Sequence, residues 1–132
     1  MHIKNHLNFD VLIKNYSDRI NQIVDHRREA SNHYTIHDVM MSALACMYMQ
    51  SRSLLVFQRQ LELRSNRNNL KGMFRVHQIP KTSAMKDFID EIKPEELSPV
   101  FKTYMSKLQR SNMLKPYQFI NDKYLVALDL EF

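Results

Sequence analysis

Two histidines have a spacing that could bind a metal ion. His33 and His37 stand four residues apart, and on a continuous helix this spacing places two imidazoles beside one ion. Thr35, however, has the context of a helix N-cap, because Asp38 follows it three residues later. His33 is therefore expected to precede the helix, and no Glu or third ligand follows at a fitting distance. The sequence predicts neither a metal site nor a cofactor.

The sulfur-containing side chains indicate core packing. Cys46 is the single cysteine, so the chain has no intramolecular disulfide and no thiolate zinc site, which suits a reducing compartment. It lies in an apolar stretch and is expected to be an inert buried thiol. Met40, Met41, Met47 and Met49 flank it and are expected to fill the core, with a Met-rich protein-binding groove as the alternative.

Basic side chains are concentrated in one part of the chain. The segment 52–86 holds eight Lys and Arg residues against the single acid Glu62, a net charge of +7, so the rest of the chain sums to −2 within the total of +5. A polyanion-binding surface needs this concentration, because each cation that neutralises a phosphate releases condensed counterions. The alternative is a solvated charged face.

The side chains that we expect to contact DNA lie in the second half of this segment. Lys and Arg would contact phosphates, and the start of the helix after Pro80 could add backbone N–H donors. Direct base reading would come from Ser83 or Lys86. The predicted DNA-binding residues are Arg67, Lys71, Arg75, Lys81, Thr82, Ser83 and Lys86.

Length and composition indicate one globular domain. A chain of 132 residues can bury one sizeable core. The 44% hydrophobic and 25% charged residues are ordinary for a soluble protein, and a single glycine argues against a loop-rich all-β fold. The apolar stretch 39–49 is too short for a membrane span, and the first ten residues lack the apolar core of a signal peptide. We therefore expect a cytoplasmic protein without membrane contact.

Apolar residues recur at three- and four-residue steps through most of the chain, which predicts a mainly α compact helical bundle. A first amphipathic helix is expected over residues 9–26. The central core helix is expected to begin after its N-cap, Thr35, and to run to about Gln50. Ser53 is the next predicted N-cap, and SNRNN, residues 65–69, is expected to end the helix that Ser53 opens.

The second half of the chain predicts further helices and then strands. A short helical stretch is expected over 70–76, and Thr82 or Ser83 is expected to cap the helix that follows, giving the layout of a helix-turn-helix pair. One long helix is expected over 93–114. After Pro116 the period changes, and YQFI and KYLVALDL predict a short β-hairpin. The expected bundle has about five to six helices.

Three segments, in this order, resemble the N-terminal portion of DDE-type insertion-sequence transposases. They are TIHDVMMSALACMYMQSRSLLVFQRQ, NLKGMFRVHQIPKTSAMKDFIDEIKPEELSPVFK and YQFINDKYLVALD. The resemblance covers the chain from about Thr35 to Asp129. In that family an all-helical region precedes a ribonuclease-H-like catalytic core, whose first strand carries the first catalytic Asp within an ALDGT-like sequence.

Asp129 of LVALD matches the position of that first metal-binding carboxylate. Such sites cleave phosphodiesters with two metal ions held by several carboxylates, and one Asp cannot hold that pair. The later Asp and Glu of the family would lie beyond Phe132. The sequence also departs from the family at Leu130 and Glu131, where Gly-Thr is usual. Without a complete DDE triad, Asp129 is expected to be inactive alone, and the chain is not expected to be an enzyme.

The resemblance implies a non-catalytic DNA-binding domain or remnant of a transposase, truncated before the catalytic core, that binds double-stranded DNA through its basic helical surface. Residues 1–132 would form a single domain, with a helical DNA-binding-type part over about 9–113 and the hairpin over about 117–131. The alternative is a protein–protein interaction or regulatory module that forms a homodimer or binds an intact transposase.

Overall fold

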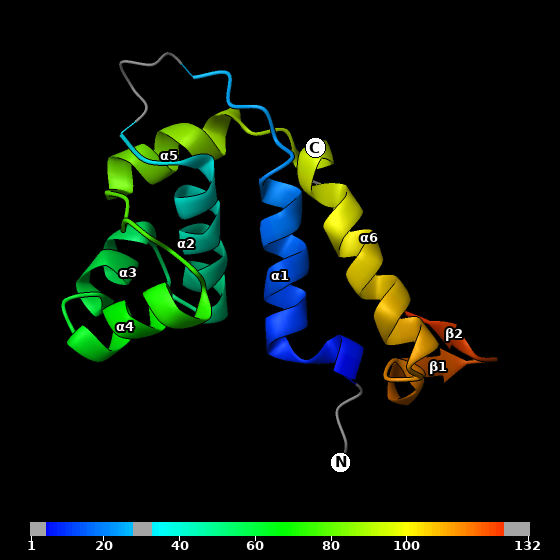
Figure 1. Ribbon diagram of the computed structural model, residues 1–132. Coiled ribbons are helices and arrows are strands. Elements are labelled where there is room, and N and C mark those ends of the chain that lie inside the picture. Colours follow the sequence, from blue (N-terminus) through cyan, green and yellow to red (C-terminus); the bar gives the residue numbers. More distant parts are fainter. Residues whose placement is uncertain (1–4, 28–32, 126–132) are drawn as a thin grey trace, which may run out of the picture.

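The computed structural model describes residues 5–27 and 33–125, and over these residues the chain is mainly helical (Figure 1). A 3₁₀ turn, η1 (Asn5–Leu7), precedes the six helices α1 (Phe9–Ile20), α2 (Ile36–Tyr48), α3 (Leu54–Gln60), α4 (Arg64–Met73), α5 (Thr82–Glu91) and α6 (Pro94–Arg110). A second 3₁₀ turn, η3 (Lys115–Tyr117), leads to the strands β1 (Gln118–Ile120) and β2 (Lys123–Tyr124). The predicted fold class, a mainly α bundle ending in a short β-hairpin, is confirmed.

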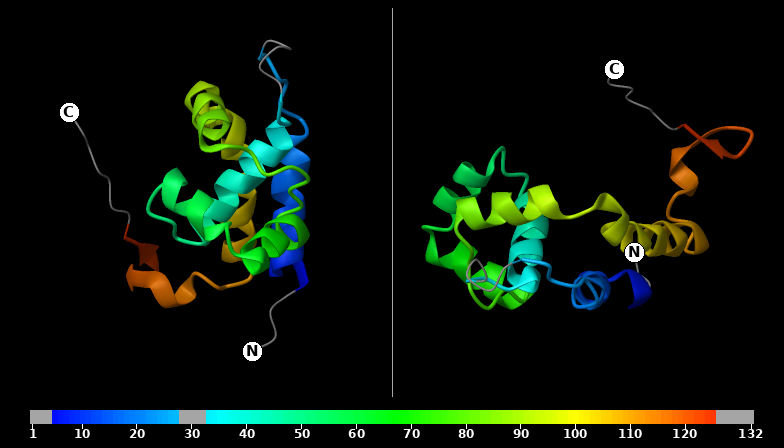
Figure 2. Two further views of the ribbon diagram at one scale, coloured as in Figure 1. Left: turned by 90° about the vertical axis from the view of Figure 1, so that its left-hand side faces the viewer. Right: turned by 90° about the horizontal axis from the view of Figure 1, so that it is seen from above.

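Helix α2 lies in the middle of the bundle. α1 packs beside α2, and α6 packs on the other side of α1, so that these three helices form a row (Figure 1). α5 crosses the N-terminal end of α2, while α3 and α4 lie on the side of α2 away from α1. The hairpin lies at the C-terminal end of α6, far from α3, α4 and α5 (Figure 2).

The central core helix begins where the sequence predicts. Thr35 is the N-cap of α2, and its hydroxyl accepts a hydrogen bond from the backbone N–H of Asp38 at 3.0 Å. Ser53 caps α3 in the same way, accepting from the N–H of Val56 at 3.2 Å. These caps satisfy backbone donors that the first turn of a helix leaves without partners. The N-caps predicted at Thr35 and Ser53 are therefore confirmed.

The sulfur-containing side chains of α2 divide between core and surface. Met40 and Met41 are buried, as predicted, and so is Cys46, where burial raises the pKa of the thiol. Met49 is half-buried against the core. Met47 is 62% exposed, so the prediction that it fills the core is wrong. Met47 lies near the C-terminal end of α2, past the stretch of this helix that is buried on every face.

The first helix is shorter than its apolar pattern predicts. α1 ends at Ile20 rather than near residue 26. The guanidinium of Arg27 donates to both carboxylate oxygens of Asp25, at 2.9 and 2.7 Å, and to the carbonyl oxygen of Tyr34 at 2.8 Å. It also lies 4.9 Å from the ring centroid of Phe88 in α5. These contacts hold the chain in a non-helical path toward α5.

The structure corrects the predicted boundaries around α4. SNRNN lies inside α4 instead of ending α3, and 70–76 is not a separate helix, because α4 runs from Arg64 to Met73. The buried side chain of Leu70 anchors α4 to the core. The cap of the following helix is also different: Lys81, and neither predicted hydroxyl residue, is the N-cap of α5, without a side-chain cap bond.

The hairpin turn forms at the predicted Asn-Asp pair. β1 pairs with β2 in antiparallel fashion. Asn121 and Asp122 have φ of 50° and 58°, the left-handed conformation that both central residues of a type I′ turn require and that Asn and Asp tolerate. The rest of the predicted second strand, with Asp129, lies outside the described residues.

Candidate functional site

The predicted helix-turn-helix layout, a short helix over 70–76 followed by the helix after Pro80, is wrong, because residues 74–81 separate α4 from α5. Helices α3 and α4 form a tight-turn pair instead. Residues 61–63 join these two helices, the length that helix-turn-helix pairs use. Side chains of α4 close the corner: Asn66 Nδ2 donates to the carbonyl oxygen of Gln60 at 2.7 Å, and Arg67 Nη1 donates to two carbonyl oxygens of the connecting segment at 2.9 and 2.8 Å. Arg67, a predicted DNA contact, is therefore held at this corner.

Helix α4 presents a polar and basic surface to solvent. Only Leu70 of this helix is fully buried, and the chain contains no Asp or Glu between Leu63 and Lys86. Arg67, Gly72 and Met73 are exposed, and we name the other exposed residues of α4 the α4 arc: Arg64, Ser65, Asn68, Asn69 and Lys71. Of these, only Lys71 belongs to the predicted set. The sequence places Ser65, Asn68 and Asn69 at a helix end, because Asn is a poor helix former and is typical of turns.

A basic hollow lies beyond the C-terminal end of α4. The backbone turns at Arg75, whose φ is 57°, and the N–H of buried Val76 donates to the carbonyl oxygen of Leu70 at 3.3 Å. Arg75 is exposed at this turn. The hollow has a volume of about 660 Å³ and is lined by Ser17, Asn21, Thr35, His37, Lys71, Arg75, Val76 and His77. The structure thus brings Lys71 and Arg75 together against α1 and the start of α2.

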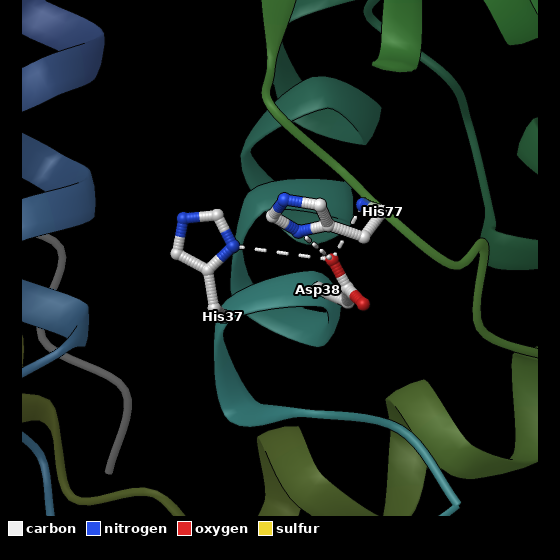
Figure 3. Close-up of side chains that lie close together, drawn as sticks. All are labelled: His37, Asp38 and His77. Atoms are coloured by element: carbon white, nitrogen blue, oxygen red, sulfur yellow. Dashed lines mark hydrogen bonds and ion pairs between the residues drawn. The ribbon is translucent and has the colours of Figure 1, made fainter.

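A buried carboxylate fixes the segment that carries these cations. The Asp38 side chain is 4% exposed, and its Oδ1 and Oδ2 accept backbone N–H groups of His77 and Gln78 at 2.8 and 3.1 Å. The imidazoles of His37 and His77 both approach the same oxygen of this carboxylate (Figure 3), and their ring centroids are 5.9 Å apart. Their Nδ1 atoms are 3.9 and 3.5 Å from Asp38 Oδ1. Asp38 therefore ties the first turn of α2 to the segment after α4.

His37 is held on the opposite side by α1. Its Nε2 forms a 2.8 Å hydrogen bond with Ser17 Oγ, which is buried. Burial lowers the pKa of His37, and the positive charge of Arg75 and the neighbouring His77 act in the same direction, while Asp38 opposes them. The neutral imidazole is therefore favoured at neutral pH, and it can donate from only one of its two nitrogens.

The remaining predicted DNA-binding residues lie at the start of α5. Lys81 and Ser83 line a second hollow of about 1140 Å³, which also contains Asp87, Asp90 and Glu91. This hollow has mixed charge, in contrast to the basic hollow. The other two predicted residues are half-buried Thr82 and exposed Lys86. The predicted set is thus divided between the α3–α4 corner, the basic hollow and α5.

The basic segment is left unneutralised by the acids that the structure describes. Across residues 5–27 and 33–125, the ion pairs are Lys14–Asp18, Arg19–Glu96, Arg27–Asp25 and the contacts of His37 and His77 with Asp38. None of these pairs includes a Lys or Arg between Arg52 and Lys86. Their charge is therefore available to a polyanion.

The histidine cluster is a feature that sequence spacing missed. The sequence spacing pairs His37 with His33, four residues before it, but among the described residues His37 lies beside Asp38 and His77 instead. His77 is 40 positions from His37, and the backbone bonds of Asp38 decide this approach. The spacing of residues along the sequence cannot predict this contact, because the contact depends on how α4 packs in the fold.

By its fold and its surface, the chain is a mainly helical protein with a tight-turn pair, α3 and α4, and a basic face. Comparisons with protein families, with curated proteins and with solved structures found no match. Across the part of the chain that the structure describes, no helix is both long and apolar enough to cross a membrane.

Proposed function

We propose that this chain is a non-catalytic DNA-binding module that contacts duplex DNA through the α4 arc and the basic hollow. The observation that carries the proposal is the surface of α4 and the turn after it. Arg64, Lys71 and Arg75 are exposed there and form no ion pair with the described acids. Phosphate contacts from such cations supply most of the affinity of DNA-binding proteins.

The α3–α4 pair supports a specific docking mode. In helix-turn-helix proteins the second helix enters the major groove, which is wide enough to admit an α-helix. In this chain the second helix is α4, and its exposed Asn68 and Asn69 have the donor and acceptor pair that reads adenine. Lys71 and Arg75 at the end of α4 would contact the adjacent phosphates. The α4 arc would thus read bases while the hollow fixes the register.

The start of α5 would provide a second phosphate contact. The first turn of α5 has no side-chain cap, so its backbone N–H groups, together with Lys81, Thr82 and Ser83, can face a phosphate. Asp87 and the other acids of the second hollow make this contact weaker than that of the basic hollow. The resemblance to the N-terminal region of DDE-type transposases supports the same function, in transposition, and extends over these elements.

Removal of two cations tests the proposed surface. Lys71→Gln/Arg75→Gln would be compared with Lys102→Gln/Arg110→Gln, which removes the same charge from α6, where both control residues are exposed. Fluorescence anisotropy with a labelled duplex would be measured from about 50 to 200 mM salt. Two lost phosphate contacts would lower the slope of log affinity against log salt by about 1.8.

The control double variant should lose much less of this slope than the Lys71/Arg75 variant. The proposed surface is wrong if the Lys71/Arg75 variant keeps the wild-type slope, or if the α6 variant loses as much. Absence of salt-dependent duplex binding by the wild-type chain would reject DNA binding altogether. Circular dichroism of each variant shows whether the helical fold is kept.

A protein–protein interaction module is the second candidate, and one observation favours it. Large apolar side chains are exposed on α6 and the hairpin: Phe101 is 47%, Met105 51%, Phe119 72% and Ile120 60% exposed. Exposed apolar patches and strand edges are typical of binding surfaces. Light scattering over a wide concentration range tests self-association. A monomer at every concentration, with the same result for Phe101→Ser, would count against a homodimer.

A further inference from the structure

We propose that His37, Asp38 and His77 form a zinc-binding site at the edge of the basic hollow. One ligand atom from each residue, two ring nitrogens and a carboxylate oxygen, lies within 4.8 Å of the other two. Figure 3 shows the three side chains converging from the first turn of α2 and the segment after α4. This inference is independent of the DNA-binding proposal.

The distances fit a site that closes by a small movement. Zinc bonds of about 2.0–2.2 Å place tetrahedral ligand atoms roughly 3.3–3.5 Å apart. The Nδ1 atom of His77 already lies 3.5 Å from Asp38 Oδ1, and that of His37 lies 3.9 Å away. The His77 side chain is 84% exposed, so its imidazole can rotate toward the other two ligands without displacing packed atoms.

An unpaired buried nitrogen points to a ligand at this position. Within the described residues, Nδ1 of His37 is buried and has no hydrogen-bond partner. When Nε2 carries the proton and donates to Ser17 Oγ, Nδ1 presents a lone pair toward the carboxylate of Asp38. Two facing acceptors repel each other, and a cation between them removes the repulsion. The hydrogen bond to Ser17 is also the kind of support that holds metal-binding imidazoles in place.

The ligand types select the metal. Two imidazoles and one carboxylate suit Zn²⁺, whereas Mg²⁺ and Ca²⁺ prefer all-oxygen sites. Three protein ligands leave at least one position for water or an anion. Lys71 and Arg75, which line the hollow with both imidazoles, repel a divalent cation and therefore weaken the site relative to one without these charges.

The test uses tag-free protein that has been stripped with a chelator. Isothermal titration with ZnCl₂ should give one saturable site, and the thermal unfolding midpoint should rise with Zn²⁺. His77→Ala should lower the affinity at least about tenfold, because even loss of an outer-shell partner costs about 10–100-fold. His33→Ala is the matched control, since His33 is exposed and lies outside the cluster. It should bind zinc as the wild type does.

The zinc affinity of Arg75→Gln is a second measurement, and a cluster that serves only the fold predicts no change in it. Removing this positive charge should tighten zinc binding by about threefold or more. The same variant should weaken DNA binding, so failure of one proposal can be distinguished from failure of the other. Nitrogen-15 NMR of the imidazoles should report coordination through Nδ1 in both His37 and His77.

Two results would overturn the zinc site. One is the absence of a saturable single site in the wild type. The other is a His77→Ala affinity within threefold of that of His33→Ala, which would assign any zinc binding to other groups. His77→Ala removes only an exposed side chain and keeps the backbone N–H that Asp38 accepts. Its unfolding midpoint in chelator should therefore match that of the wild type.

Discussion

We expect truncation of the Asp38 side chain to destabilise the fold strongly, because its buried carboxylate joins two segments that are distant in the sequence. It accepts the backbone N–H groups of His77 and Gln78 at 2.8 and 3.1 Å. The substitution Asp38→Ala removes both acceptors, so these donors lose their protein partner. It should also release the turn that carries Arg75 from the first turn of α2.

The expected cost follows from the two bonds. A hydrogen bond to a charged group contributes about 1.5–3 kcal/mol. His77 and Gln78 are exposed residues, so water can replace part of what is lost, and the low end of the range applies to each. Asp38→Ala should therefore lower the free energy of unfolding by about 3 kcal/mol. For 132 residues, this corresponds to roughly 10 °C in the unfolding midpoint.

Urea unfolding monitored by circular dichroism, with a chelator present to exclude bound metal, measures this cost. Asp18→Ala is the matched control, because Asp18 pairs with Lys14 on the surface of α1 with side chains 52% and 62% exposed. Such a pair contributes less than about 0.5 kcal/mol. Asp38→Asn keeps one oxygen acceptor and should fall between the two variants.

Amide hydrogen exchange identifies where the stability is lost. The His77 and Gln78 amides should lose protection in Asp38→Ala and keep it in Asp18→Ala. The reasoning is refuted if Asp38→Ala unfolds within about 0.5 kcal/mol of Asp18→Ala. Unchanged protection of these two amides would refute it as well, even if the variant were less stable for another reason.

Three further predictions concern the helical scaffold. Burial raises the pKa of Tyr16 and of its neighbour Tyr104 to about 12. Because the neutral phenols are favoured in the folded state, unfolding titrations should show stability falling from pH 10 to 12, by about 2–3 kcal/mol for Tyr16, and Tyr16→Phe should reduce this dependence while Tyr104 keeps the rest. Thr35→Ala should cost about 1 kcal/mol in urea unfolding, and Thr35→Ser should restore it. Arg19 donates to the carbonyl oxygen of Glu96 at 2.6 Å and to its carboxylate at 3.0 Å. Arg19→Met should therefore lower the free energy of unfolding by about 1–3 kcal/mol in urea unfolding. The control variant Lys14→Met should leave it nearly unchanged.

Local sequence signals predicted the features that local chemistry determines. Thr35 and Ser53 were identified as N-caps because a hydroxyl before an apolar-periodic run satisfies nearby backbone donors, and both do so. The long helix from Pro94 begins as predicted, since proline fits the first turn. Asn121 and Asp122 form the turn of the hairpin for the same kind of local reason.

Features that depend on tertiary contacts were not predictable. The propensities of SNRNN predict a helix end, yet Asn66 and Arg67 donate to the carbonyl oxygens of Gln60 and Leu61 at the end of α3 and stabilise the corner. α1 ends early because Arg27 bonds to Asp25 and contacts α5. The approach of His77 to Asp38 likewise depends on two segments that only the folded chain brings together.

The two proposed sites have an electrostatic consequence for each other, because both open onto the same hollow. Zinc bound by His37 and His77 would add positive charge beside Lys71 and Arg75, which face the hollow with them. A phosphate there would gain attraction, so Zn²⁺ and DNA should each raise the affinity of the other by the same factor. Since the coupling requires the metal ligand, it should vanish in His77→Ala and persist in His33→Ala. If the wild type binds zinc by titration, equal DNA affinity with zinc and with chelator would show that the phosphate lies away from the hollow.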